Sequence, residues 1–138
     1  IPKQKSQTSV ADIMQSADCG VFPVRAEGWN LELLEMMACG KHVIATDYSG
    51  HTEFCDDDNC MLIKTDTLEE ANDGKWFTGQ GEWAHIGDKQ IDLIAAYMRD
   101  IHALKQGGHL EENTSGIETA QRFSWENSAK QIMSIEYV

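Results

Sequence analysis

Residues 19–46 read C-G-V-F-P-V-R-A-E-G-W-N-L-E-L-L-E-M-M-A-C-G-K-H-V-I-A-T, and this stretch decides the fold. Its first part, 19–24, is a continuous rather than alternating apolar run, which is typical of a parallel strand buried on both faces. Residues 29–39 place apolar side chains around much of a helix, and Gly40 supplies the stop. A second β-rich run covers 42–46. Strand, helix and strand in this order predict a parallel sheet.

The flanking residues extend this pattern in both directions. Thr8 or Ser9 can cap a short helix that ends before Asp18. Downstream, a turn at 49–53 precedes a third strand at 61–64. We therefore predict an α/β fold, a Rossmann-like parallel sheet with flanking helices.

Residues 65–87 interrupt the pattern with four glycines and few apolar runs. We predict an ordered loop insertion here, held to the body of the domain by Trp76, Phe77 and Trp83. Aromatic residues in a loop could instead contact a substrate, and both interpretations stay open.

Three helices are predicted after the insertion. Asp88 caps a long amphipathic helix that ends at Gly107, a second helix covers 114–122, and Ser124 caps the last. One side of the long helix carries Ile91, Ile94, Ala95, Met98, Ile101 and Leu104 or Lys105. In the last helix Ala129, Ile132 and Met133 are predicted to face inward.

Size and charge narrow the class of protein. The 138 residues, 1–138, have the size of a single domain, and the start at Ile1 without an apolar leader segment suggests a piece of a longer protein. A formal net charge of −12 opposes binding to nucleic acid or anionic lipid. No run reaches the ~18 apolar residues that span a bilayer, so we expect no transmembrane segment. Four cysteines without a C-x-x-C pair predict a cytoplasmic protein.

Potential metal ligands occur at unfamiliar spacings. His51, Cys55 and Cys60 form an H-x3-C-x4-C pattern that lacks a fourth ligand. The acidic run 56–59 has neither the glycine nor the distal glutamate of a calcium loop. We predict no metal and no resident cofactor.

Two carboxylates flank the start of the central helix. Glu27 lies in a loop at the carboxyl end of a strand, where open parallel sheets bind ligands, and Glu35 lies two turns into the helix. The amides of 29–32 can hold a diphosphate at the helix start. Glu35, among apolar neighbours, would need donors such as a ribose diol, and Glu27 could accept from sugar hydroxyls. Alternatively, Glu27 caps the helix and Glu35 pairs with a lysine or arginine.

Residues 27–53 resemble the E-x7-E region of family-four retaining glycosyltransferases, whose usual form is E-G-F-G-L-x-x-x-E-A-M-A-C-G-x-P-V-I-A. Residues 59–63, N-C-M-L-I, resemble the N-G-x-L-V strand of that family, and 123–126 read F-S-W-E, as the family does near its C-terminus. The resemblance covers about residues 9–136 in the same order, which makes it more specific than a lone motif.

The resemblance implies a GT-B fold, with this chain as the C-terminal half of the donor domain. It implies a hexosyltransferase that binds a nucleotide-diphosphate sugar and retains the anomeric configuration without a metal. The N-terminal acceptor domain and the first strands of the donor domain have no matching positions here. We therefore expect the isolated piece to be inactive.

Matching positions carry the family's site onto this chain. The donor-binding set is Glu27, Gly28, Trp29, Asn30, Leu31, Glu32 and Glu35. By this resemblance Glu27 contacts the donor sugar and is the catalytic residue, and Glu35 binds the ribose. The amides of Trp29 and Asn30 would meet sugar hydroxyls. Those of Leu31 and Glu32 would meet the distal phosphate.

Three positions depart from the family pattern. Asn30 replaces a glycine, Glu32 adds a carboxylate near the phosphate amides, and His42 replaces a common proline. A like charge weakens diphosphate binding unless the Glu32 side chain points to solvent.

Two other functions remain open from the sequence. One is a sugar-nucleotide epimerase or phosphorylase of the same fold, and the other is a non-catalytic Rossmann-like interaction module. The strand order of the resembled family further implies that the strand around 21–24 lies at an exposed edge, beside the first of three strands that the chain lacks. Such an edge invites pairing with a second copy, which predicts a homodimer, or with extra segments.

Overall fold

The computed structural model describes residues 6–135 and contains a three-stranded parallel sheet in the order β1-β2-β3. The strands are β1 (Cys19–Phe22), β2 (His42–Thr46) and β3 (Met61–Ile63). Cys19 pairs with His42, and Ile44 pairs with Met61. The predicted α/β fold with a parallel sheet is therefore confirmed, although the first and third strands are shorter than the sequence predicts.

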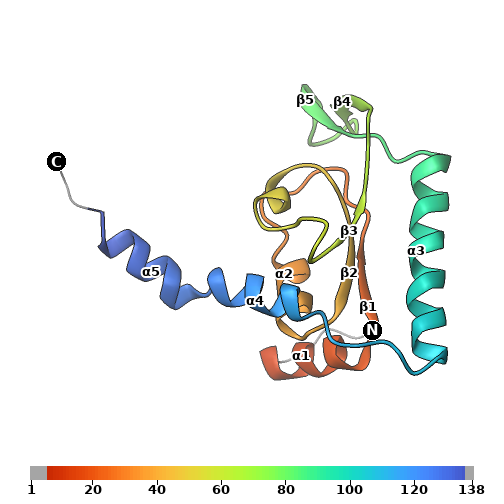
Figure 1. Cartoon of the computed structure of the whole chain (residues 1–138). Helices are drawn as coiled ribbons and strands as arrows, with labels where there is room; N and C mark the ends of the chain where they lie inside the picture. Colours follow the sequence, from red (N-terminus) through yellow and green to blue (C-terminus); the bar gives the residue numbers. More distant parts are fainter. Residues whose placement is uncertain (1–5, 136–138) are drawn as a thin grey trace.

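Helices flank this sheet on both sides (Figure 1). The helices are α1 (Gln7–Ser16), α2 (Leu31–Ala38), α3 (Asp88–Gln106), α4 (Thr114–Arg122) and α5 (Trp125–Met133), with a 3-10 turn η1 (Gly50–Glu53) after β2. The side chain of Ser6, rather than of Thr8 or Ser9, caps α1. Likewise, Gly87 and not Asp88 is the capping residue of α3.

The core divides between the two faces of the sheet because side chains alternate along each strand. Val43 and Ala45 of β2 face the side of α2, and Ile44 faces the side of α3. The larger cluster consists of Leu33, Leu34, Met36, Met37, Val43, Ala45, Phe54, Cys55, Cys60 and Leu62. The smaller one consists of Ile44, Ile63 and Ile101, with Leu93, Ile94 and Tyr97 of α3 packed against it. Burial on both faces explains the continuous apolar runs of the sequence.

Strand β1 forms one edge of this sheet within residues 6–135. Its outer side has no partner strand there, and Pro23 follows its last residue. The predicted edge position is therefore confirmed. Whether a second copy covers this edge stays a prediction.

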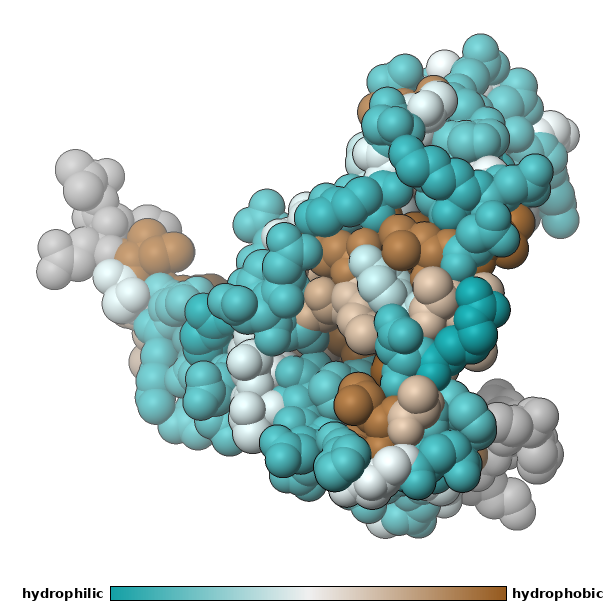
Figure 2. Space-filling view, turned by 45° about the vertical axis from the view of Figure 1, so that its right-hand side comes forward, coloured by the Kyte–Doolittle hydropathy of each residue, from teal (hydrophilic) through white to brown (hydrophobic). Residues whose placement is uncertain are grey.

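Residues 65–87, for which the sequence predicts a loop, contain an antiparallel hairpin of β4 (Leu68–Asn72) and β5 (Thr78–Ala84). Its turn is built around Asp73, whose Oδ1 accepts from three amides at 2.8–3.0 Å. The hairpin forms the lobe at the top of Figures 1 and 2. On the face drawn in Figure 2, apolar surface gathers in the hollow beneath this lobe.

Helix α5 projects away from the body of the domain (Figure 1). Ser124 caps it as predicted, since its Oγ accepts from the Asn127 amide at 3.2 Å. The prediction that Ala129, Ile132 and Met133 face inward is wrong, because all three are exposed, Met133 by 86%. In α3, Ile94 and Ile101 face the sheet, whereas Ile91, Met98 and Leu104 are exposed.

None of the helices within residues 6–135 is long and apolar enough to cross a bilayer.

Candidate functional site

The two carboxylates singled out from the sequence lie at the carboxyl end of the sheet. Glu27 lies in the loop between β1 and α2, and Glu35 lies in the middle of α2. Both residues are exposed, so Glu35 does not carry the desolvation cost that its apolar neighbours suggest. Within residues 6–135 neither carboxylate forms an ion pair, and Glu27 does not cap the helix. The described chain therefore contains neither the helix cap by Glu27 nor the ion pair of Glu35 that the sequence left open as alternatives.

Asn30 begins the central helix in a left-handed conformation, with φ of 67°. Its Oδ1 accepts from the Leu33 amide at 3.3 Å, and the residue is 6% exposed. Glycine and asparagine are the residues that adopt this conformation most readily, and asparagine is also a preferred cap. This explains how asparagine can occupy a position at which the family that residues 27–53 resemble has glycine.

The first turn of α2 leaves two backbone donors available. Among the described residues, the amides of Leu31 and Glu32 have no acceptor, whereas the next two amides bond to Asn30. Free amides and the positive end of a helix dipole can bind an anion even in an acidic protein. The Glu32 side chain is exposed to solvent, which screens its charge.

The loop after β2 forms hydrogen bonds with the β1–α2 loop, which carries Glu27. Ser49 Oγ accepts from the Glu27 amide at 2.8 Å, and the Gly50 amide donates to the Glu27 carbonyl at 3.0 Å. A Cβ on Gly50 would lie 2.0 Å from the Gly28 carbonyl oxygen, so only glycine fits this approach. The sequence predicts a turn at 49–53 but not its contact with Glu27, because a Ser-Gly pair after a strand marks only a loop.

Three aromatic rings, those of Trp29, Phe54 and Phe123, pack together next to the start of α2. The Trp29 ring lies 5.0 Å from Phe54 and 5.3 Å from Phe123, measured between centroids, in tilted and edge-to-face arrangements. Phe54 and Phe123 are 5.8 Å apart. Edge-to-face and tilted aromatic contacts at these distances are favourable, so the cluster fixes the chain where the helix begins.

The hairpin is joined to both loops at this end of the sheet. The Ala84 amide donates to the Arg25 carbonyl at 2.8 Å, and Tyr48 Oη donates to the Glu82 carbonyl at 3.1 Å. The Arg25 guanidinium lies 4.1 Å above the Trp83 ring and forms an ion pair with Glu69.

The sequence prediction for the aromatic residues of the hairpin is right for one of three. Trp83 is partly buried against Arg25, but Trp76 and Phe77 are 76% and 53% exposed. Since these two side chains are exposed, they do not hold the hairpin to the body. Backbone hydrogen bonds and Arg25 hold it instead.

The candidate residues line two separate cavities. Glu27 and the hairpin line one of about 460 Å³. Glu35 lines another of about 630 Å³, together with Trp29, Leu31 and Trp125. The structure therefore places both carboxylates at the same loop and helix but does not bring them into one cavity.

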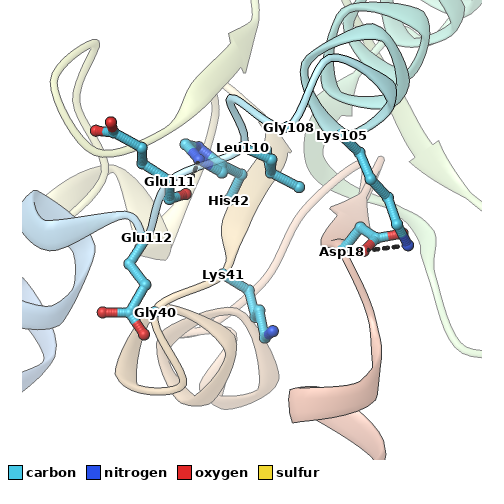
Figure 3. Close-up of a pocket in the computed structure, with 9 residues that line it drawn as sticks. All are labelled: Asp18, Gly40, Lys41, His42, Lys105, Gly108, Leu110, Glu111 and Glu112. Atoms are coloured by element: carbon cyan, nitrogen blue, oxygen red, sulfur yellow. Dashed lines mark hydrogen bonds and ion pairs between the residues drawn. The ribbon is translucent and has the colours of Figure 1, made fainter.

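A further cavity lies at the opposite, amino end of the strands (Figure 3). Lys105 Nζ and Asp18 point toward one another across its rim, 2.6 Å apart. His42 also lines it and bonds through Nε2 to the Glu111 carbonyl at 2.9 Å, which gives this residue a structural role. The ends of parallel strands that bind ligands are the carboxyl ends, so we do not assign the site here.

The three residues considered as metal ligands, His51, Cys55 and Cys60, are buried in the core. His51 is fully buried, and its Nε2 lies 2.6 Å from the Thr46 carbonyl. Cys55 and Cys60 are buried free thiols, and the hydrogen bond that the Cys60 thiol makes to Cys55, together with burial, raises the pKa of Cys60 well above its ordinary range. Within residues 6–135 no group of three or more histidine, cysteine or acidic residues is placed to hold a metal ion.

The chain matches a known family of proteins. Residues 3–73 match the model of the family described as Glycosyl transferases group 1, a segment that contains β1, α2, β2 and β3 and ends in the hairpin. No curated protein matches the chain.

Proposed function

Because the chain belongs to the group 1 glycosyl transferases, we propose that it binds the nucleotide-diphosphate sugar donor of a retaining transferase of the GT-B type. The observation that carries this proposal is the arrangement at α2. Two exposed carboxylates without partners in the described chain flank a helix start with two free amides. A donor of this class presents in one molecule the groups that such a site can bind: sugar hydroxyls, a diphosphate and a ribose diol.

The diphosphate would lie at the start of α2. The Leu31 and Glu32 amides are the available donors, and the helix dipole adds to them. Asn30 supports this arrangement, because its cap engages the Leu33 amide and leaves the two preceding amides free. A site made of backbone donors needs no metal and no basic cluster, which agrees with a chain of net charge −12.

The nucleoside would occupy the cavity beside Glu35. This cavity has a mostly apolar lining, including Trp29 and Leu31, and one carboxylate. A base can pack on the apolar wall while the ribose diol donates to Glu35. The acceptor groups would come from a further domain, and four free thiols fit a cytoplasmic enzyme.

Isothermal titration of the chain with UDP-glucose, GDP-mannose and ADP-glucose tests donor binding. We expect at least one to bind and Glu35→Ala to weaken it about 30-fold to 100-fold, since two charge-assisted hydrogen bonds are lost. Glu118→Ala, an exposed glutamate on α4, serves as the matched control and should leave the affinity unchanged. Absence of binding by all three would contradict the proposal and favour a non-catalytic module.

A second prediction concerns Glu27 and catalysis in the complete transferase. Positive charge develops at the anomeric carbon in glycosyl transfer, and a carboxylate that faces it stabilises the transition state more than the ground state. Glu27→Gln should therefore lower kcat by about tenfold to hundredfold with little change in KM. Steady-state kinetics check this split, and an effect on KM alone would make Glu27 a ground-state contact.

A further inference from the structure

The hairpin and the loop that carries Glu27 line the cavity of about 460 Å³. The loop contributes Arg25 and Glu27, and β5 with its turn contributes Phe77, Gln80, Glu82 and Trp83. This volume falls within the ~300–1,000 Å³ of small-molecule sites, and the wall combines aromatic rings with carboxylate and amide groups.

Phe77 is exposed but held in a defined position. Its amide donates to Asp73 Oδ1 at 3.0 Å, and its carbonyl accepts from the Asp73 amide at 3.0 Å. The same bond from Phe77, followed by those from Lys75 and Trp76, lowers the pKa of Asp73. An edge-to-face contact with Trp83, at 5.8 Å between centroids, orients the ring further. An aromatic ring positioned by these contacts can pack against one face of a ligand.

The charges around the cavity favour a neutral ligand with hydroxyl groups. Arg25 is paired with Glu69, so its charge is compensated. Within residues 6–135 the carboxylates of Glu27 and Glu82 have no cationic partner. Two free carboxylates repel a phosphate or an acidic sugar but accept hydrogen bonds from hydroxyls.

Trp83 adds an unused donor to the same wall. Its Nε1 is buried and has no acceptor among the described residues, although buried indole donors normally have one. A hydroxyl group in the cavity could serve as that acceptor after a small shift of the ring.

We propose that this cavity binds a neutral pyranose, with one C–H face of the ring against Phe77 and hydroxyls donating to Glu82 and Glu27. The family match ends at residue 73, so β5 lies outside the matched segment. Any selectivity among sugars that the β5 residues provide would therefore belong to this chain and not to the matched family segment. The inference rests on the proposed function in one respect: the pyranose is taken to belong to the donor or to the acceptor.

Saturation-transfer NMR with the methyl glycosides of glucose, galactose and mannose tests the site without any nucleotide. We expect at least one glycoside to receive saturation from the wild-type chain and Phe77→Ala to lower this signal at least about fivefold. Trp76→Ala is the matched control, because Trp76 is an exposed aromatic residue of the same turn that does not line the cavity. Loss of the signal in Phe77→Ala but not in Trp76→Ala supports the site. No transfer to any glycoside, or equal signals in Phe77→Ala and wild type, overturns it.

Titration with UDP-glucose, GDP-mannose and ADP-glucose and with the free nucleoside diphosphates separates the two sources of the sugar. If Phe77→Ala weakens the nucleotide sugars as well as the glycosides but leaves the free nucleoside diphosphates unchanged, the pyranose is that of the donor, and if it weakens only the glycosides, it is that of the acceptor. Glu35→Ala acts on the nucleotides alone. Wild-type nucleotide affinity in Glu35→Ala would contradict the proposed function while the pyranose site still stood.

Discussion

Replacing Gly50 with alanine is expected to lower the free energy of unfolding by ~3–4 kcal/mol and the turnover of the complete transferase about hundredfold. The added Cβ would lie 2.0 Å from the Gly28 oxygen and 2.5 Å from its carbonyl carbon. Both contacts are with backbone, which cannot move aside as the end of a side chain can. The two loops must therefore separate and lose the bonds that Glu27 makes to Ser49 and Gly50.

Gly28→Ala is the control for this substitution. No atom lies within 4 Å of a Cβ at Gly28, although it belongs to the same pair of loops. Its unfolding free energy should stay within about 0.5 kcal/mol of the wild type. Urea denaturation measures both variants, and a wild-type unfolding free energy for Gly50→Ala would mean that the two loops do not approach as the structure has them.

The parallel sheet could be predicted because burial leaves a direct record in the sequence. Strands covered on both faces carry continuous apolar runs, and β1, β2 and β3 do so. Gly40, with φ of 70°, marks the end of α2 in the same local way.

The hairpin and the orientation of α5 could not be predicted in this way. Strand β5 has the sequence T-G-Q-G-E-W-A, with two glycines and mostly exposed residues, so its pairing depends on β4 and on the distant Arg25 rather than on its own pattern. For α5 the apolar pattern is present, but the described body of the domain offers no surface that covers it.

The candidate site likewise has parts that the sequence predicts and parts that it does not. The position of Glu27, Glu35 and the free amides follows from the order strand, loop and helix, which the sequence contains. The restraints on Glu27 come from Ser49 and Gly50, more than twenty residues away, and such contacts leave no local pattern. The resemblance to a family identified the segment, but the structure was needed to find what holds it.

Phe54→Ala should be the most destabilising of these substitutions, by ~3–5 kcal/mol of unfolding free energy. Phe54 is 3% exposed and packs against Trp29 and Phe123, so alanine leaves a cavity in the larger core cluster. Phe77→Ala is the matched control, because it removes the same atoms from a side chain that is 53% exposed. The control should cost less than about 1 kcal/mol.

Phe54→Leu separates packing from function within the same cluster. Leucine keeps much of the volume, so the chain should stay folded with a loss of about 1–2 kcal/mol, but it cannot make the tilted ring contact at 5.0 Å that positions Trp29. Since Trp29 directly precedes the capping Asn30, we expect a smaller but measurable loss of affinity for the nucleotide sugar, about threefold to tenfold. Urea denaturation and titration calorimetry on the same samples measure both effects. Unfolding costs for Phe54→Ala no larger than for Phe77→Ala would show that the aromatic cluster is not a packing element. Wild-type affinity in Phe54→Leu would show that it supports the fold without positioning the helix start.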